Sequence, residues 1–180
     1  PVMFFKPDSA LLPKRNPFYI PSFSNDVHHE LELVVKINRL GKNISEKFAP
    51  KYYSEIGIGI DFTARDVQAR LKDKGLPWEK AKAFDHSAPI SHHFININDI
   101  NDINDINFSL KKNGDVAQIG NSKDMIFNIN KLISEISKFT TLKIGDLIFT
   151  GTPKGVGKVD IGDVLECFIE EEKMLTVKVK

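Results

Sequence analysis

The chain has 180 residues, of which 41% are hydrophobic and 27% charged, with a formal net charge of +1. This composition is typical of a single globular domain with a substantial core, and it excludes an intrinsically disordered chain. Acidic and basic residues are interspersed, so the charge pattern indicates neither a nucleic-acid partner nor a membrane surface. No apolar run approaches the ~20 residues of a membrane-spanning helix. Cys167 is the only cysteine, which excludes an intrachain disulfide framework and favours a reducing, cytoplasmic location.

The first 60 residues predict a β-rich region. Two short apolar pieces, "PVMFFKP" and "FYIPSF", are interrupted by prolines and suggest edge strands and turns. Residues 27–37 predict a strand, and residues 56–61, "IGIGID", predict a second strand that is buried. Between them, residues 44–53 predict a short helix that Pro50 ends or kinks.

The next elements are a helix and a polar insertion. Residues 63–75 predict a helix, with Thr63 as its N-cap and Gly75 after its end. The stretch "ININDINDINDIN" repeats Ile-Asn-Asp. Its isoleucines recur every three residues, which fits neither helix nor strand, so we predict a polar loop or edge-strand insertion, with a low-complexity interaction tract as the alternative.

The last third of the chain predicts a hairpin, a helix and three strands. Asn113-Gly114 is the strongest short-range hairpin signal. Residues 122–138 carry one apolar stripe at helical spacing and predict a helix capped by Ser122. Three β-type segments follow, "DLIFTGTP", "DVLECFIEE" and "MLTVKVK". The sum predicts an α+β, β-dominated fold with a few helices in a single domain over residues 1–180.

Two glutamates inside the predicted strand 27–37 are the most informative feature. Side chains alternate along a strand, so Glu30 and Glu32 project from one face together with His28. One interpretation is a solvated face of an antiparallel sheet. The other is a divalent cation, because neighbouring carboxylates repel each other unless a positive charge lies between them, and their hard oxygens suit Mg²⁺ or Mn²⁺.

A cation site needs a further acid, and Asp61 is the best candidate. It lies where the buried strand ends and the predicted helix begins. Arg65 and Gln68 follow at i and i+3, and therefore share a helix face. The alternative is that Asp61 merely caps the helix.

Three other motifs do not support the functions they suggest at first sight. "GTPKGVGK" has five residues between the glycines where a P-loop has four, and a valine follows its Gly-Lys. "GIGIDF" lacks the third glycine of a dinucleotide fingerprint. The five histidines match no standard zinc spacing, and no nucleophile-elbow sequence is present.

Four segments together resemble the fumarylacetoacetate hydrolase superfamily, and in particular its single-domain acylpyruvate hydrolase and oxaloacetate decarboxylase branch. They are "HHELELVV", "GIDFTARDVQ", "KGLPWEKAKAFDHSAPIS" and "DLIFTGTPKGVG". The resemblance runs over nearly the whole chain, and only the Ile-Asn-Asp repeat stands apart. It implies a β-sandwich-like roll, usually dimeric.

The resemblance also implies roles for individual residues. Glu30, Glu32 and Asp61 match the family's metal ligands, for Mg²⁺ or Mn²⁺. Four residues match its catalytic and substrate-binding side chains: Arg65, Gln68, Lys82 and Thr152. Lys82, Arg65 and Gln68 are the expected catalytic residues, and all four are expected to bind the substrate.

The implied reaction is cleavage of the C3–C4 bond of a 2-oxo acid through a pyruvate enolate whose charge the metal stabilises. Acylpyruvate hydrolysis and oxaloacetate decarboxylation both fit. Three alternatives stay open: an isomerase of 2-hydroxyhepta-2,4-diene-1,7-dioate type, an oxaloacetate tautomerase, and a non-catalytic β module stabilised by a metal. The expected partners are a small 2-oxo acid and a second copy of the chain.

The relatives also carry an upstream segment with a histidine and a glutamate that are taken to activate water. The present chain begins after the position of that segment. We therefore expect these 180 residues to bind metal and 2-oxo acid while hydrolysing acylpyruvates poorly.

Overall fold

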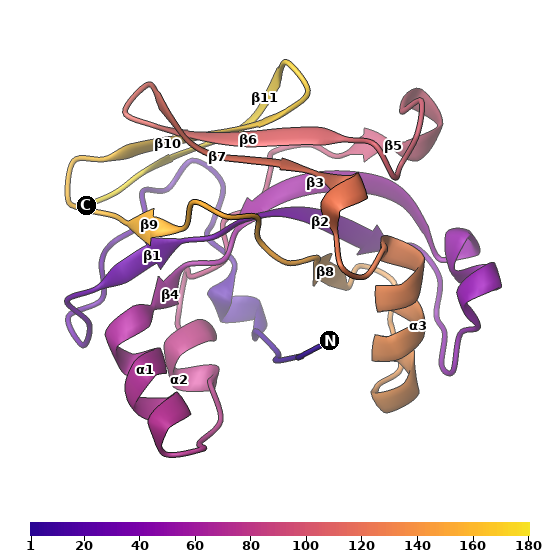
Figure 1. Ribbon diagram of the computed structural model, residues 1–180, viewed down its shortest axis with the longest axis horizontal. Coiled ribbons are helices and arrows are strands. Elements are labelled where there is room, and N and C mark those ends of the chain that lie inside the picture. The colour runs from indigo at the N-terminus through magenta and orange to yellow at the C-terminus, as the bar shows by residue number, and fades with distance from the viewer.

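The computed structural model describes residues 1–180, which form three antiparallel sheets and a few helices (Figure 1). The first sheet has the order β11–β10–β6–β7, with strands Glu172–Lys178, Val164–Ile169, Asn107–Lys112 and Asp115–Asn121. The second has the order β5–β3–β2–β8, with strands Ile95–Asn96, Tyr53–Ile60, Leu31–Ile37 and Leu147–Phe149. The third has the order β4–β1–β9, with strands Thr63–Ala64, Val27–His29 and Gly157–Lys158. The prediction of a β-dominated α+β fold is confirmed.

Three α-helices and four 3₁₀ helices accompany the sheets. The α-helices are α1 Arg65–Asp73, α2 Glu79–Lys82 and α3 Ile129–Phe139. The 3₁₀ helices are η1 Asp8–Ala10, η2 Glu46–Lys51, η3 Ile97–Asp99 and η4 Ser122–Asp124. Figure 1 shows α1 and α2 side by side below β1 and β4, with α3 at the opposite end of the molecule. None of the helices has both the length and the apolar character needed to span a bilayer.

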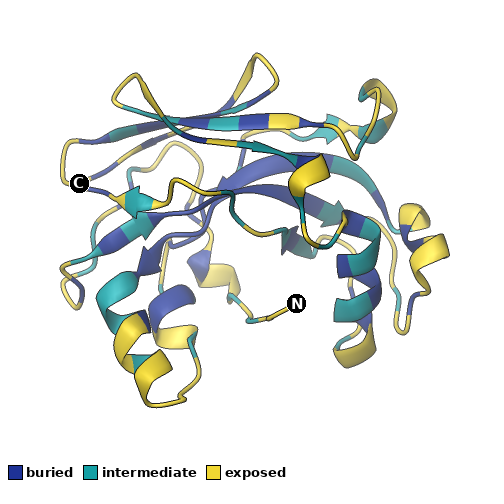
Figure 2. Cartoon of the chain, viewed as in Figure 1, coloured by how far each residue is buried: buried dark blue, intermediate teal, exposed yellow.

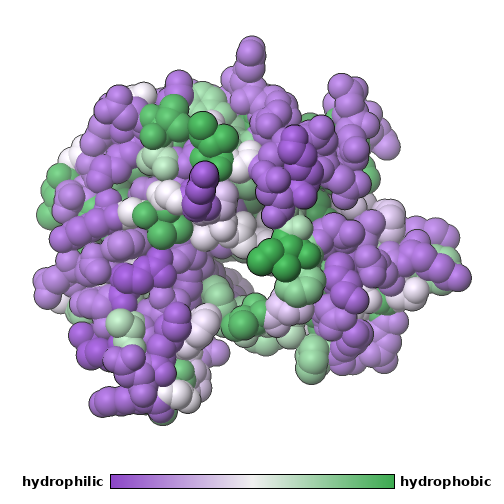
Figure 3. Space-filling model, viewed as in Figure 1, coloured by the Kyte–Doolittle hydropathy of each residue, from purple (hydrophilic) through white to green (hydrophobic).

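The core lies between the two larger sheets. β2 and β3 run through its middle and are buried along most of their length (Figure 2). Their apolar side chains belong to one continuous cluster of 29 buried residues. Burial of a strand on both faces explains why its sequence is nearly continuous in apolar residues. The face seen in Figure 3 is mostly hydrophilic, and hydrophobic side chains gather around a central hollow.

The predicted strand 27–37 is divided at Glu30 into β1 and β2, which belong to different sheets. At the division, the Glu30 carbonyl accepts a hydrogen bond from Asp61 N at 2.8 Å. The same division therefore brings the end of β3 and its aspartate next to the first glutamate.

The proline-rich start of the chain does not form the predicted edge strands. It contributes η1 and two isolated bridges, Leu11 to Ala88 and Phe18 to Val179. Prolines at positions 7, 13, 17 and 21 remove ladder donors, so this segment packs as an extended loop.

Two predicted helix caps are wrong. Ala64, not Thr63, is the N-cap of α1, and the Thr63 hydroxyl lies 2.5 Å from Lys82 Nζ instead. The predicted helix 122–138 is η4 followed by α3, and Asn128 caps α3 by accepting from Lys131 N at 2.8 Å. Ser122 instead accepts from Ile106 N at 2.9 Å. In both cases the hydroxyl expected to cap the helix instead accepts a hydrogen bond from a residue distant in sequence.

The predicted hairpin and the polar insertion are both confirmed. Asn113 and Gly114 join β6 to β7 with φ values of 56° and 92°, as a two-residue turn between right-twisted strands requires. The Ile-Asn-Asp stretch forms the edge strand β5, η3 and turns. Its isoleucines Ile97, Ile100 and Ile103 pack, partly buried, against the core.

Candidate active site

Three carboxylates converge where β1, β2 and β3 meet. Glu30 lies between β1 and β2, Glu32 is the second residue of β2, and Asp61 directly follows β3. Each offers an oxygen within 4.8 Å of the other two, and all three side chains are buried. His28, predicted on the same face, pairs with Asp26 at 2.9 Å instead.

Two lysines lie against this cluster. Lys82, at the end of α2, donates from Nζ to Glu30 at 2.7 Å, Asp61 at 2.6 Å and Thr63 at 2.5 Å. An ammonium has three donors, so these bonds use all of them. Lys6, from the extended N-terminal segment, lies 2.8 Å from Asp61 Oδ1 and is also held by Ser87 Oγ at 2.8 Å and the Lys82 carbonyl.

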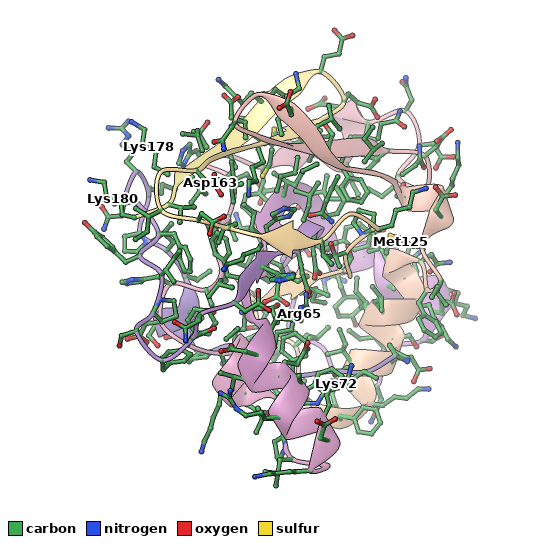
Figure 4. The ribbon with its side chains drawn as sticks, turned by 60° about the vertical axis from the view of Figure 1, so that its left-hand side comes forward. Arg65, Lys72, Met125, Asp163, Lys178 and Lys180 are labelled. Carbon is green, nitrogen blue, oxygen red and sulfur yellow. The ribbon has the colours of Figure 1, made fainter.

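The first turns of α1 add a guanidinium and an amide. Figure 4 shows Arg65 at the end of α1 that meets β1 and β9. Arg65 pairs with Glu30 Oε1 at 2.5 Å and donates to Gln68 Oε1 at 2.7 Å. The i, i+3 spacing puts both residues on one helix face. Gln68 therefore contacts Arg65, and Arg65 in turn contacts the carboxylate cluster through Glu30.

The crowding of like charges is visible in the pKa values. Burial, followed by the neighbouring Asp61 carboxylate, raises the pKa of Glu32 to about 8. Burial would also raise the pKa of Glu30, but Lys82 and Arg65 outweigh it and leave that pKa below its usual value. Burial lowers the pKa of Lys6, and the Asp61 carboxylate opposes this shift. The cations therefore compensate Glu30 more fully than Glu32.

The donor set fits a hard divalent cation. Three buried carboxylates offer oxygens at mutual distances that one ion can bridge. Asp61 Oδ1 is buried, and its partner is the ammonium of Lys6, 2.8 Å away. Glu32 is the carboxylate with the weakest compensation. A bound cation would relieve the repulsion at Glu32.

The loop after β8 closes the site on the Glu32 side. Gly151 N donates to Glu32 Oε2 at 2.6 Å, and Gly151 has a φ of +100°, which favours glycine. The next residue, Thr152, is half-buried, and its Oγ1 accepts from Gln118 Nε2 at 3.0 Å. The structure thus brings every predicted site residue into one region, with Thr152 beside the carboxylates rather than in contact with them.

Sequence reasoning missed several residues of this region: Lys6, Thr63, Ser87, Gln118 and Gly151. Two carried a signal. Lys6 is the single charge within "PVMFFKP", and Gln118 is the polar residue in "DVAQIGN" whose strand position points inward. Neither residue is near the carboxylates in sequence, so local pattern did not connect them to the site.

Comparisons with known proteins show the family to which the chain belongs. The family model "Fumarylacetoacetate (FAA) hydrolase C-terminal" matches residues 1–180. The chain is 43% identical over 176 residues to oxaloacetate tautomerase YcgM of Escherichia coli, covering 98% of this chain and 80% of that protein.

Two solved structures share the fold. Fumarylpyruvate hydrolase from Pseudomonas aeruginosa, in complex with Mn²⁺ and pyruvate, has a TM-score of 0.91 and 34% identity, over 98% of this chain and 77% of its own. 2-Hydroxyhepta-2,4-diene-1,7-dioate isomerase from Mycobacterium marinum has a TM-score of 0.90 and 34% identity, over 99% and 68%. The resemblance drawn from the sequence motifs is confirmed, as is the fold that it implied. The chain belongs to the fumarylacetoacetate hydrolase family, in its single-domain branch.

Proposed function

We propose that this chain is the catalytic domain of a metal-dependent enzyme that forms the enolate of a 2-oxo acid of the oxaloacetate class. The observation that carries the proposal is the buried cluster of Glu30, Glu32 and Asp61 with Lys82 and Arg65 against it. A purely structural metal site would not need a buried lysine and an arginine on the same carboxylates.

Mg²⁺ or Mn²⁺ would be held by Glu30, Glu32 and Asp61. When bound, the ion would supply Lewis-acid stabilisation of negative charge on the ketone oxygen of the substrate, worth several kcal/mol. The relative from Pseudomonas aeruginosa, crystallised with Mn²⁺ and pyruvate, supports both the metal and the substrate class.

The chain's own side chains would bind and orient the acid. Arg65 offers a fork of donors to a carboxylate, and Gln68 holds one side of that guanidinium in place. The Thr152 hydroxyl would donate to the carboxylate from the loop that also contacts Glu32. Lys82 Nζ holds protons beside the carboxylates, and we propose that it exchanges one with the substrate.

Keto–enol interconversion of oxaloacetate is the activity that we place first. It moves one proton between C3 and the ketone oxygen and requires neither water activation nor a leaving group. The 43% identity to an oxaloacetate tautomerase supports it. Cleavage of the C3–C4 bond, by decarboxylation or acylpyruvate hydrolysis, is the second candidate, and the resemblance to fumarylpyruvate hydrolase supports it.

A substrate panel tests the proposal. The purified chain is assayed with Mg²⁺, with Mn²⁺ and after chelation, on oxaloacetate, an acylpyruvate and a 2-hydroxy-dienedioate. We expect metal-dependent loss of the enol absorbance of oxaloacetate, abolished by Glu32→Gln. Glu171→Gln, in the exposed turn before β11, is the matched control. A chain that binds Mg²⁺ but neither turns over nor binds any 2-oxo acid would be the non-catalytic module, and the proposal would be wrong.

We further propose that the protein is a homodimer, as the family resemblance implies. Light scattering coupled to size exclusion measures the mass in solution against the 20.3 kDa of one chain. A mass near that of one chain at micromolar concentration would contradict it.

A further inference from the structure

Gln118 is a fully buried amide at the junction of three segments. It lies on β7 with 1% of its surface exposed. Its Oε1 is 2.8 Å from His29 Nδ1 and accepts from Leu31 N at 3.0 Å. Its Nε2 donates to Thr152 Oγ1 at 3.0 Å and to the Pro153 carbonyl at 3.1 Å. One side chain therefore joins β1, the start of β2 and the loop after β8.

Two of these partners fix which way the amide points. A backbone N–H only donates, so the atom facing Leu31 N is the oxygen. A backbone carbonyl only accepts, so the atom facing the Pro153 carbonyl is the nitrogen. His29 must then donate from Nδ1, and Thr152 Oγ1 must accept from Gln118. The roles of all four contacts follow from the backbone alone.

The orientation has a consequence for Thr152. A hydroxyl has a single proton. Because Gln118 Nε2 donates to the Thr152 oxygen, the Thr152 proton is not used in this contact and is available to another acceptor. The competing contact inside the loop, from Thr152 Oγ1 to the Pro153 carbonyl, is 3.5 Å long, and Gln118 already donates to that carbonyl. The hydroxyl is thus held as a donor one residue from Gly151, whose N–H binds Glu32.

We propose that Gln118 is a positioning residue for the substrate: it presents the Thr152 hydroxyl as a hydrogen-bond donor to the carboxylate of the 2-oxo acid. The inference rests on the proposed function. Because Gln118 also binds Leu31 N, between Glu30 and Glu32, it ties the substrate-binding loop to the strand that carries two of the proposed metal ligands. Gln118 itself touches neither metal nor substrate, and acts through Thr152.

The glycines of the same loop support this role. Gly155 has a φ of +99°, and a Cβ there would lie 2.4 Å from the Ala117 carbonyl, next to Gln118. A Cβ at Gly157 would lie 3.2 Å from His29 Nε2. Glycine at these positions therefore lets the loop lie directly against Gln118 and His29. The segment "GTPKGVGK" is a loop packed on an amide rather than a phosphate-binding loop.

The test separates metal binding from acid binding. Gln118→Glu keeps the size of the side chain and the acceptor for His29 and Leu31 N, but an ionised carboxylate has no donor and would draw the Thr152 proton to itself. Calorimetry measures the Kd of Mg²⁺, and then the Kd of oxalate, a planar mimic of the enolate, at saturating Mg²⁺. For Gln118→Glu at saturating Mg²⁺ we expect an oxalate Kd raised by roughly 10- to 100-fold, the range for a hydrogen bond to a charged group.

A double-mutant cycle shows whether the two residues act as one unit. Thr152→Val should raise the oxalate Kd by a similar factor. Thr152→Ser, which keeps the hydroxyl, should retain most of the parent's affinity for oxalate. The double variant Gln118→Glu/Thr152→Val should be no weaker than Thr152→Val alone. Losses that multiply as independent factors would overturn the proposal, as would a Gln118→Glu variant with the parent's oxalate affinity.

A second measurement does not depend on the folding of Gln118→Glu. Gln68 and Gln118 are the only glutamines, so glutamine labelled with ¹⁵N gives only two side-chain amide pairs, which Gln68→Asn assigns. In the ligand-free protein, Thr152→Val should shift the Gln118 pair and leave the Gln68 pair in place. An unmoved Gln118 pair would overturn the proposal. A parent that binds no oxalate with Mg²⁺ would instead overturn the proposed function, and this inference with it.

Discussion

Replacing Glu32 by glutamine should have opposite effects on stability with and without a divalent cation. Glu32 is buried beside Asp61 and Glu30, and its pKa is raised from 4.5 to about 8. The folded metal-free protein therefore retains a proton on Glu32 that the unfolded chain has released. Folding stability from this group is then fully present below about pH 4.5 and is lost as the pH rises from there to about 8.

The size of the effect follows from the shift. The folded and unfolded values differ by about 3.5 pH units, and one unit corresponds to about 1.4 kcal/mol, so ionisation of Glu32 opposes folding by about 5 kcal/mol once the pH exceeds 8. Glu32→Gln carries no charge, and its amide oxygen can still accept from Gly151 N. The metal-free variant should thus exceed the parent in unfolding free energy at pH 8 and approach it at pH 5.

Saturating Mg²⁺ should reverse the order. A cation bound by Glu30, Glu32 and Asp61 stabilises only the folded state, and so raises the unfolding free energy of the parent. The variant loses one of three ligands and should gain much less. Urea unfolding at pH 5, 6.5 and 8, with Mg²⁺ and with chelator, measures all four combinations. Glu171→Gln, exposed and distant from the cluster, should follow the parent throughout.

Two results would refute this reasoning. One is a Glu32→Gln variant whose metal-free stability runs parallel to the parent from pH 5 to 8, which would mean that the carboxylate is not held against its neighbours. The other is an equal gain from Mg²⁺ in parent and variant, which would place the ion elsewhere.

Three further substitutions test the surroundings of the site. Lys6→Met removes the cation that lies 2.8 Å from Asp61. We expect the unfolding free energy of the metal-free protein to fall by about 3 kcal/mol and the Mg²⁺ Kd measured by calorimetry to be lower. An unchanged Kd would contradict the role of Lys6 in balancing the charge of the cluster. Asp163→Asn tests an acid-sensitive link: burial would raise the pKa of Asp163, but Asp160 N, Asn113 and Lys112 outweigh it and lower that pKa. The stability that Asp163 contributes is therefore present above about pH 4 and lost on acidification, so the difference between parent and variant in urea unfolding should shrink as the pH falls below about 4. Gly151→Ala places a Cβ at a φ of +100°, and we expect a loss of about 1–2 kcal/mol in thermal unfolding together with weaker oxalate binding; a variant as stable as the parent would show that the loop relaxes freely.

Sequence reasoning reached the features that depend on local chemistry. Asn113-Gly114 predicted its turn because asparagine and glycine adopt positive φ values with little steric strain. Glu30 and Glu32 were singled out because two carboxylates on one strand face repel each other unless a positive charge lies between them, and Asp61 because it ends the buried strand. Arg65 and Gln68 followed from helical spacing, which places residues three apart on one face.

The tertiary structure decided how those residues are held. Lys6 contacts Asp61 across 55 positions of chain, and Gln118 binds Leu31 N across 87. The hydroxyls of Thr63 and Ser122 do not cap the predicted helices but accept from Lys82 Nζ and Ile106 N. A hydroxyl, an amide or an ammonium can satisfy its hydrogen bonds with many partners, and local pattern ranks only the partners nearby in sequence. The packing of the sheets determines which residues distant in sequence come into contact. The sequence therefore indicated the acids of this site, whereas the groups that neutralise and orient them were determined by the fold.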